Sequence, residues 1–104
     1  MNIEVTDSRA ASRYEIAVDG TVIGFADYRR TDDRVVFPHT VITPSMRERG
    51  MAEILVRHAL DAARGDGHAV VPACWYVARY IDEHPEYQDL LHEHSKPGSA
   101  GIPK

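Results

Sequence analysis

The chain has 104 residues, of which 43% are hydrophobic and 27% are charged. This length suits a single domain, and the hydrophobic content is enough for a core, which excludes a wholly disordered protein. The formal net charge of −4 gives no general attraction to nucleic acid. No apolar stretch reaches the ~18 residues that a membrane span needs, and the N-terminal residues lack the apolar segment of a signal peptide. We therefore expect a cytoplasmic monomer or small homo-oligomer, with no nucleic-acid or membrane partner.

The first half of the chain has strand patterns. Apolar and polar residues alternate over residues 13–18, and the pair Asp19-Gly20 that follows is a strong hairpin signal, so residues 21–28 are the expected partner strand. A third run, residues 34–42, is β-branched and aromatic but contains Pro38. Because proline has no N–H for a sheet ladder, it must lie at an edge or a bulge. This half predicts an antiparallel meander with a defect in its last strand.

The second half begins with a helical pattern. Residues 50–64 place apolar side chains on one wide face, as in a helix that lies on a sheet. The glycines in residues 65–67 end this helix. A short strand over residues 68–72 then follows a crossover helix, so we expect it to lie parallel to the strand before the helix.

A second helix is predicted over residues 74–83, ended by His84-Pro85, with a further turn or two over residues 86–92. The element order is thus βββ-α-β-α, an α/β domain with a mixed, mostly antiparallel sheet. Residues 95–104 are rich in proline, glycine and serine and predict a flexible tail. We therefore divide the chain into a domain of residues 1–94 and a tail of residues 95–104.

The segment between the interrupted strand and the long helix carries the most chemical information. A helix start exposes N–H groups without an intrahelical partner, and together with the helix dipole they suit a phosphate. Arg47 and Arg49 add guanidinium donors, and Gly50 permits close approach of the backbone. An ordinary helix start with solvated arginines is an equally good interpretation of this local sequence alone.

Residues 47–52 resemble the Q/R-x-x-G-x-G/A signature of the GNAT superfamily of acyl-CoA-dependent N-acyltransferases. More narrowly, the chain looks like the small, minimal GNAT-like N-acetyltransferase domain family, because residues 39–41, 71–77 and 80–87 follow the same order and spacing. The resemblance covers roughly residues 14–91. It implies a GNAT-like sheet in which two neighbouring strands splay apart.

The resemblance also implies acetyl-CoA as the acyl donor, and the single cysteine gives no reason to expect a zinc cluster. Main-chain amides of the signature loop are then expected to hold the pyrophosphate, and the preceding strand to hold the pantetheine arm. The thioester is expected in the notch between the strand that ends at Ile42 and the strand that ends at Pro72. The implied cofactor-binding residues are Val41, Ile42, Arg47, Glu48, Arg49, Gly50, Met51 and Ala52.

Two residues are candidates for catalysis. Cys74, the only cysteine, is predicted at a helix start near the thioester, where the dipole favours a thiolate that could take the acetyl group. An inert cysteine in the core is the alternative. Many GNAT proteins carry a carboxylate on the splayed strand, but residues 35–42 contain none, which leaves His39 as the only titratable side chain there to act as a base. A histidine packed in the sheet is the alternative.

Two further features are weaker. Tyr76 and Tyr80 lie where GNAT proteins often keep a tyrosine that protonates the departing thiolate, although helical packing explains the same spacing. Residues 92–94, His-Glu-His, lack further ligands and a rigid frame, so metal binding is not expected.

The resemblance favours an acetyl-CoA-dependent N-acetyltransferase that acts on a primary amine. The chain lacks the pair of helices that roofs the acceptor site in larger GNAT proteins, and an open acceptor side suits a peptide or a lysine. The alternative is a CoA-binding or acetyl-CoA-binding module with little or no transferase activity.

Overall fold

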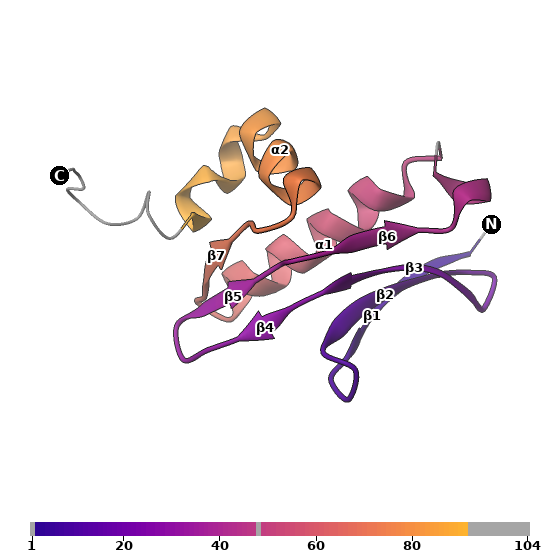
Figure 1. Ribbon diagram of the computed structural model, residues 1–104, viewed down its shortest axis with the longest axis horizontal. Coiled ribbons are helices and arrows are strands. Elements are labelled where there is room, and N and C mark those ends of the chain that lie inside the picture. The colour runs from indigo at the N-terminus through magenta and orange to yellow at the C-terminus, as the bar shows by residue number, and fades with distance from the viewer. Residues whose placement is uncertain (1, 48, 92–104) are drawn as a thin grey trace, which may run out of the picture.

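The computed structural model describes residues 2–47 and 49–91 (Figure 1). Glu48, the histidines of residues 92–94 and the boundary between the predicted domain and tail lie outside these residues. The elements in chain order are β1 (Ile3–Ser8), β2 (Arg13–Val18), β3 (Thr21–Asp27), β4 (Arg29–Arg30), β5 (Arg34–Val36), β6 (Thr40–Ile42), the 3-10 turn η1 (Pro44–Met46), α1 (Met51–Gly65), β7 (Ala69–Val71), α2 (Trp75–Glu83) and the 3-10 turn η2 (Pro85–Leu90).

The strands form two sheets. The chain passes from the first sheet to the second between β3 and β4, and returns to the first between β5 and β6. The first has the order β1-β2-β3-β6 with antiparallel neighbours, and the second has the order β4-β5-β7. In the second sheet β4 is antiparallel to β5, whereas β5 is parallel to β7. The predicted α/β class, the mostly antiparallel sheet and the parallel return after the long helix are thereby confirmed.

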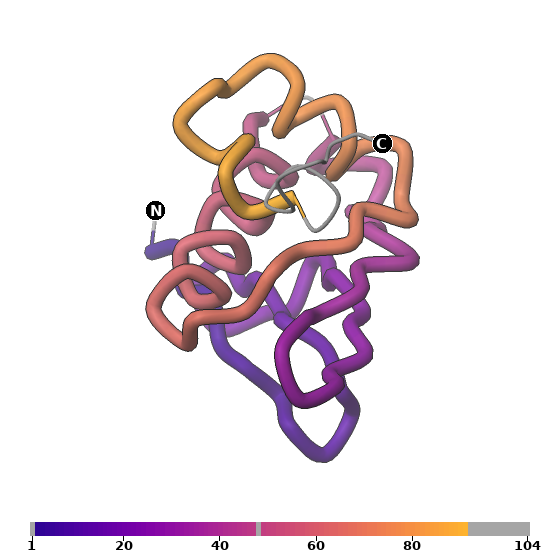
Figure 2. Tube along the Cα trace, turned by 90° about the vertical axis from the view of Figure 1, so that its left-hand side faces the viewer, coloured from indigo at the N-terminus to yellow at the C-terminus, as the bar shows by residue number. Residues whose placement is uncertain are grey.

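The helices lie on one side of the strands (Figures 1 and 2). Helix α1 packs against β2, β3, β6, β7 and α2. Most of its apolar face is buried, as the spacing of residues 50–64 predicts; the buried side chains are Met51, Leu55, Val56, Ala59, Leu60 and Ala63. No helix in the described residues is long and apolar enough to cross a membrane.

The strand predicted over residues 34–42 breaks at Pro38. Strand β5 pairs with β7 as far as Val36, and the Phe37 N–H then donates to the Val71 carbonyl over 3.1 Å. After Pro38 the chain changes partner, because β6 pairs with β3. The two parallel strands therefore part beyond Phe37, which confirms both the predicted defect and the splayed strand pair.

The hairpin signal is also confirmed, since Asp19 and Gly20 both have positive φ, 50° and 87°, as the tightest hairpin turns require. Strand β1, in contrast, was not predicted. Only Ile3 and Val5 in it are apolar, and both stay partly buried at the edge of the sheet. A turn of residues 9–12 joins β1 directly to β2, where larger GNAT proteins are expected to carry a pair of helices.

Two buried tyrosines give the fold a predicted weakness at high pH. The Tyr28 hydroxyl donates to Asp7 over 2.5 Å and the Tyr87 hydroxyl donates to Asp61 over 2.7 Å. Burial first, and then the bonded carboxylate, raises the pKa of each phenol to about 12, above the usual 10. A raised pKa contributes stability that is complete below the unfolded value and is lost as the pH rises through the folded value. We expect the free energy of unfolding, measured with urea, to fall between about pH 10 and pH 12.

The matched variant replaces both tyrosines, as Tyr28→Phe with Tyr87→Phe. Without these two hydroxyls the decline above pH 10 is expected to be shallower, although the variant starts from a lower stability at neutral pH because Asp7 and Asp61 lose a donor. An equally steep decline in the double variant would assign the alkaline loss to other groups.

Candidate functional site

The segment between β6 and α1 keeps the start of α1 open. Gly50 caps the helix in the left-handed conformation, with φ of 76°, and no side chain caps the helix start. The Ile54 N–H donates to the Gly50 carbonyl over 3.2 Å and begins the helical ladder. The N–H groups of Met51, Ala52 and Glu53 therefore have no intrahelical acceptor, and they lie at the positive end of a 15-residue helix.

The side chains of this segment fix it at both ends. Met51 is 1% exposed and anchors the start of α1 in the core. The Arg47 Nε donates to the Ile42 carbonyl over 3.1 Å and joins the segment to the end of β6. A hollow of about 560 Å³ lies beside it, lined by Pro44, Ser45, Arg47 and Arg49. Two guanidinium groups thus line an open polar hollow, and the free N–H groups at the start of α1 follow a few residues later in the chain, an arrangement suited to phosphate.

The register of β6 decides which of its main-chain groups are accessible. The His39 carbonyl accepts from the Asp27 N–H over 3.0 Å, and the Thr43 N–H donates to the Ile23 carbonyl over 2.7 Å. Since bonding sides alternate along a strand, the main-chain groups of Val41 also face β3, opposite Phe25. Those of Thr40 and Ile42 point to the other edge, the side from which β7 has parted.

No strand of the described residues pairs with this edge of β6. Arg47 occupies the Ile42 carbonyl, so the N–H and carbonyl of Thr40 and the N–H of Ile42 remain for a ligand. Val41 has an exposed side chain, but its own main-chain groups face β3 and are not part of this edge. An extended molecule with amide groups could pair here as an additional strand would.

The two candidate catalytic residues lie on different faces of β6. Cys74 caps α2, is 8% exposed, and its thiol donates to the Thr40 hydroxyl, with the sulfur 3.7 Å from the oxygen. The His39 side chain is largely exposed, and its Nδ1 lies 3.7 Å from an Asp27 carboxylate oxygen. Because consecutive residues of an extended chain point to opposite sides, Thr40 with Cys74 lies on the helical side and His39 with Asp27 on the other. The structure therefore does not bring Cys74 and His39 together.

The two partners, Thr40 and Asp27, were not predicted as site residues. Thr40 belongs to the segment of residues 39–41 that carries the resemblance, and its position two residues after Pro38 is the available signal. Nothing in the sequence around Asp27 indicates its pairing with His39, which depends on the register between β3 and β6.

The two tyrosines of α2 have different surroundings. Tyr80 is 4% exposed, stacks on His84 with ring centroids 3.9 Å apart, and accepts a hydrogen bond from the Arg57 Nε. Tyr76 is only partly buried, and burial, followed by the charge of Glu53 on α1, raises its pKa. The Tyr76 hydroxyl thus stays protonated, and it lies near Glu53 at the start of α1. The Tyr80 ring, in contrast, is packed against His84 and bonded to Arg57.

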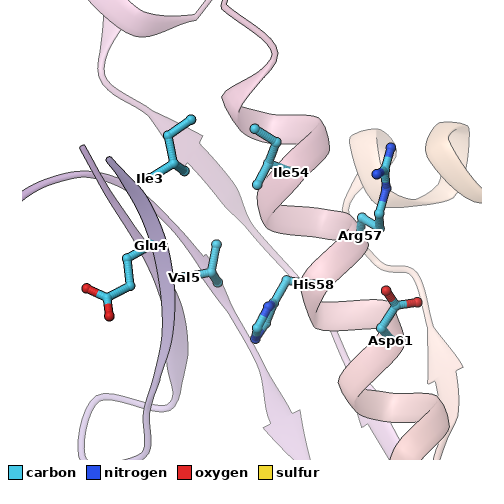
Figure 3. Close-up of a pocket in the computed structure, with 7 residues that line it drawn as sticks. All are labelled: Ile3, Glu4, Val5, Ile54, Arg57, His58 and Asp61. Atoms are coloured by element: carbon cyan, nitrogen blue, oxygen red, sulfur yellow. The ribbon is translucent and has the colours of Figure 1, made fainter. Parts of the chain in front are cut away.

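A second hollow, of about 420 Å³, lies between β1 and α1 (Figure 3). Figure 3 shows Ile3 and Val5 of β1 facing Ile54 and His58 of α1, while Glu4 points away from the helix. Two of the charged side chains that line it pair within the protein: Arg57 with Glu53 and Tyr80, and Asp61 with Tyr87. This hollow lacks the converging donors of the segment before α1.

Comparison with known proteins agrees with the resemblance. A model of the GCN5-related N-acetyltransferase family matches residues 13–90. The protein NATD1 of chicken (Gallus gallus) is 34% identical over 66 residues, which cover 62% of this chain and 60% of that protein. Human NATD1 is 33% identical over 64 residues, which cover 61% of this chain and 57% of that protein. The chain thus spans about three fifths of the length of these relatives.

Solved structures show the same fold. A GCN5-like protein from Staphylococcus aureus superposes with a TM-score of 0.67 over 86% of this chain and 88% of that chain, at 18% identity. The N-acetylglutamate synthase of Neisseria gonorrhoeae, solved with coenzyme A and N-acetylglutamate, has a TM-score of 0.58 over 78% of this chain and 21% of that chain, at 21% identity.

Proposed function

Because the chain belongs to the GCN5-related N-acetyltransferase family, we propose that it transfers an acetyl group from acetyl-CoA to a primary amine of a peptide or a lysine side chain. The observation that carries this proposal is the parting of β6 from β7 directly beside the open start of α1. The open edge of β6 can then bind the amides of the pantetheine. The donors at the start of α1, which follow soon after β6 in the chain, can bind the diphosphate.

The diphosphate is assigned to the segment before α1. Of the main-chain amides of residues 47–52 that the sequence suggests, those of Arg47 and Arg49 already donate to the Pro44 and Met46 carbonyls. The proposed donors are therefore the amides at the start of α1, where Gly50 supplies the left-handed turn, while the guanidinium groups of Arg47 and Arg49 supply charge. Glu48 belongs to this proposed set, although it lies outside the described residues. The pantetheine is assigned to the open edge of β6, through the main chain of Thr40 and Ile42 and past the exposed side chain of Val41.

The transfer needs a neutral amine, since an ammonium has no lone pair for attack. We assign its deprotonation to His39, whose Nδ1 lies 3.7 Å from an Asp27 carboxylate oxygen. Attack on the thioester carbon then forms the amide as the bond to the coenzyme A sulfur breaks. The acylated nitrogen then loses its second proton, and the departing thiolate gains one. Tyr76 is the candidate donor to the thiolate, because it is only partly buried whereas Tyr80 is engaged with Arg57 and His84; the proton from the nitrogen restores it.

Cys74 offers a two-step route instead. Its sulfur bonds to the acetyl carbon while the bond to the coenzyme A sulfur breaks, and the proton of the thiol ends on the released coenzyme A. An amine then takes the acetyl group from Cys74 and restores the thiol. The position of Cys74 beside Thr40 at the open edge of β6 supports this route, whereas its burial in the core and its separation from His39 support direct transfer.

The second candidate function is a CoA-binding module without transferase activity. It is favoured by the short turn of residues 9–12 between β1 and β2, which leaves the acceptor side without a roof. Calorimetry with coenzyme A tests what the two functions share, and absence of binding contradicts both. Release of free thiol from acetyl-CoA, with a peptide that offers one lysine or only its N-terminal amine, separates them.

We expect thiol release above the buffer rate with at least one of these peptides. Binding of coenzyme A without release would establish the module and overturn the enzyme. Two variants then divide the routes: His39→Gln is expected to lower the rate at neutral pH and to lose this effect at alkaline pH, where the amine is already free without a base. Full activity of Cys74→Ala would eliminate the two-step route.

A further inference from the structure

Thr40 occupies a position that no other residue of β6 shares. It is the first residue of β6, and its main-chain groups face the open edge. Its side chain lies on the helical face of β6, where the hydroxyl oxygen is 3.7 Å from the Cys74 sulfur. Thr40 therefore connects the proposed pantetheine edge with the thiol at the start of α2.

The position of Cys74 is fixed by its own main chain. Its N–H donates to the Phe37 carbonyl over 2.8 Å, and its carbonyl accepts from the Ala78 N–H over 3.0 Å. The main chain of Cys74 is thus held at the point where β5 ends and α2 begins. These bonds leave the direction of the side chain open, so it depends on the partner of the thiol. In the structure that partner is the hydroxyl of Thr40.

A hydroxyl can serve both states of a thiol. It accepts from the S–H of the neutral form, and after rotation it donates to the sulfur of the thiolate. In either role the hydroxyl fixes the direction of the sulfur and gives it a polar partner in otherwise apolar surroundings. Removal of the hydroxyl should therefore make Cys74 a poorer nucleophile without changing its place in the fold.

We infer that Thr40 is a positioning residue whose hydroxyl sets the orientation and reactivity of the Cys74 sulfur at the edge where the acyl thioester is bound. This inference rests on the proposed function for its biological meaning, because the sulfur meets a thioester only if acetyl-CoA occupies the edge of β6. The contact with Cys74 and its effect on the sulfur can nevertheless be measured without any acyl donor.

The test is the rate at which iodoacetamide alkylates Cys74 at neutral pH, followed by the mass of the intact protein. Cys74 is the only cysteine, so the added mass reports one site. Thr40→Val keeps the shape and the β-branch but removes the hydroxyl, and we expect it to slow alkylation about fivefold, as for the loss of one ordinary hydrogen bond. Thr40→Ser keeps the hydroxyl and is expected to react at close to the wild-type rate.

Controls separate reactivity from folding. All three proteins should react equally fast in urea, and Thr40→Val and Thr40→Ser should bind coenzyme A with equal affinity, because both keep the main-chain groups of residue 40. Changed amide spectra would show that valine disturbs β6. In that case the comparison of Thr40→Ala with Thr40→Ser tests the hydroxyl in side chains that both lack the γ-methyl group. A wild-type rate in the variants without the hydroxyl, or an equally slow rate in Thr40→Ser, overturns the inference.

A second readout relates the inference to catalysis. In the thiol-release assay Thr40→Val should lower kcat and leave the KM for acetyl-CoA unchanged, with recovery in Thr40→Ser. If wild-type protein releases no thiol, the proposed function fails while the alkylation rates still decide the role of Thr40. If thiol release is normal in Thr40→Val although alkylation of Cys74 is slow, the hydroxyl controls the reactivity of the sulfur, but the acetyl group is not transferred through Cys74.

Discussion

Gly24→Ala is expected to remove most of the stability that holds β6 in place. An alanine Cβ at this position would lie 2.5 Å from the Ile42 Cδ1 and 2.6 Å from the Val41 carbonyl oxygen. The side chain of Ile42 can rotate, but the carbonyl belongs to the backbone, so β3 and β6 must move apart. We expect a loss of about 3 kcal/mol, at the upper end for an overpacked core, and a Tm lower by roughly 10–20 °C.

The matched control is Gly65→Ala, at the last residue of α1. An added Cβ there meets no atom within 4 Å, and the backbone does not have positive φ. The expected change is between zero and about 1 kcal/mol of stabilisation, since alanine restricts the unfolded chain more than glycine does. Thermal unfolding followed by circular dichroism measures both variants. Equal effects of the two substitutions would mean that the close approach of β3 and β6 does not limit residue 24.

The second large effect concerns coenzyme A. Replacement of Arg47 and Arg49 together by alanine removes both guanidinium groups from the hollow before α1 and also frees the Ile42 carbonyl. We expect the affinity for coenzyme A to fall roughly 100-fold, because each charge-assisted hydrogen bond contributes about 1.5–3 kcal/mol before screening by solvent. Isothermal calorimetry measures the change directly.

Arg9→Ala is the control for overall charge. Arg9 lies in the turn between β1 and β2, and its side chain is 71% exposed beside Asp7. Its loss lowers the positive charge by one without touching the segment before α1, so the affinity should stay within about twofold of wild type. A double variant that binds as tightly as Arg9→Ala would exclude the two arginines from the binding site.

The elements that the sequence predicts well are those with local causes. Asp19 and Gly20 adopt positive φ without help from the rest of the chain, and Pro38 has no N–H in any surroundings. The helix over α1 follows from its own periodicity. The position of the open helix start next to the arginines was predictable for the same reason, since neighbours along the chain decide it.

The features that escaped prediction depend on pairing between distant segments. Strand β1 is an edge strand with two apolar residues, and its existence depends on β2 as a template. The register between β3 and β6 decides that Thr40 and Ile42, and not Val41, present their main chain to the open edge. A shift of one residue would reverse these roles and exchange the faces of His39 and Thr40.

The most direct test of the central claim, that main-chain amides at the start of α1 bind a diphosphate of coenzyme A, is a titration of ¹⁵N-labelled protein with coenzyme A and, in parallel, with pantetheine, which has no diphosphate. We predict that coenzyme A shifts the amide resonances of residues 49–53 as well as those of Thr40 and Ile42, and that pantetheine shifts only the latter two. Resonances of residues 49–53 that stay in place at saturating coenzyme A, or that move equally with pantetheine, would contradict the claim.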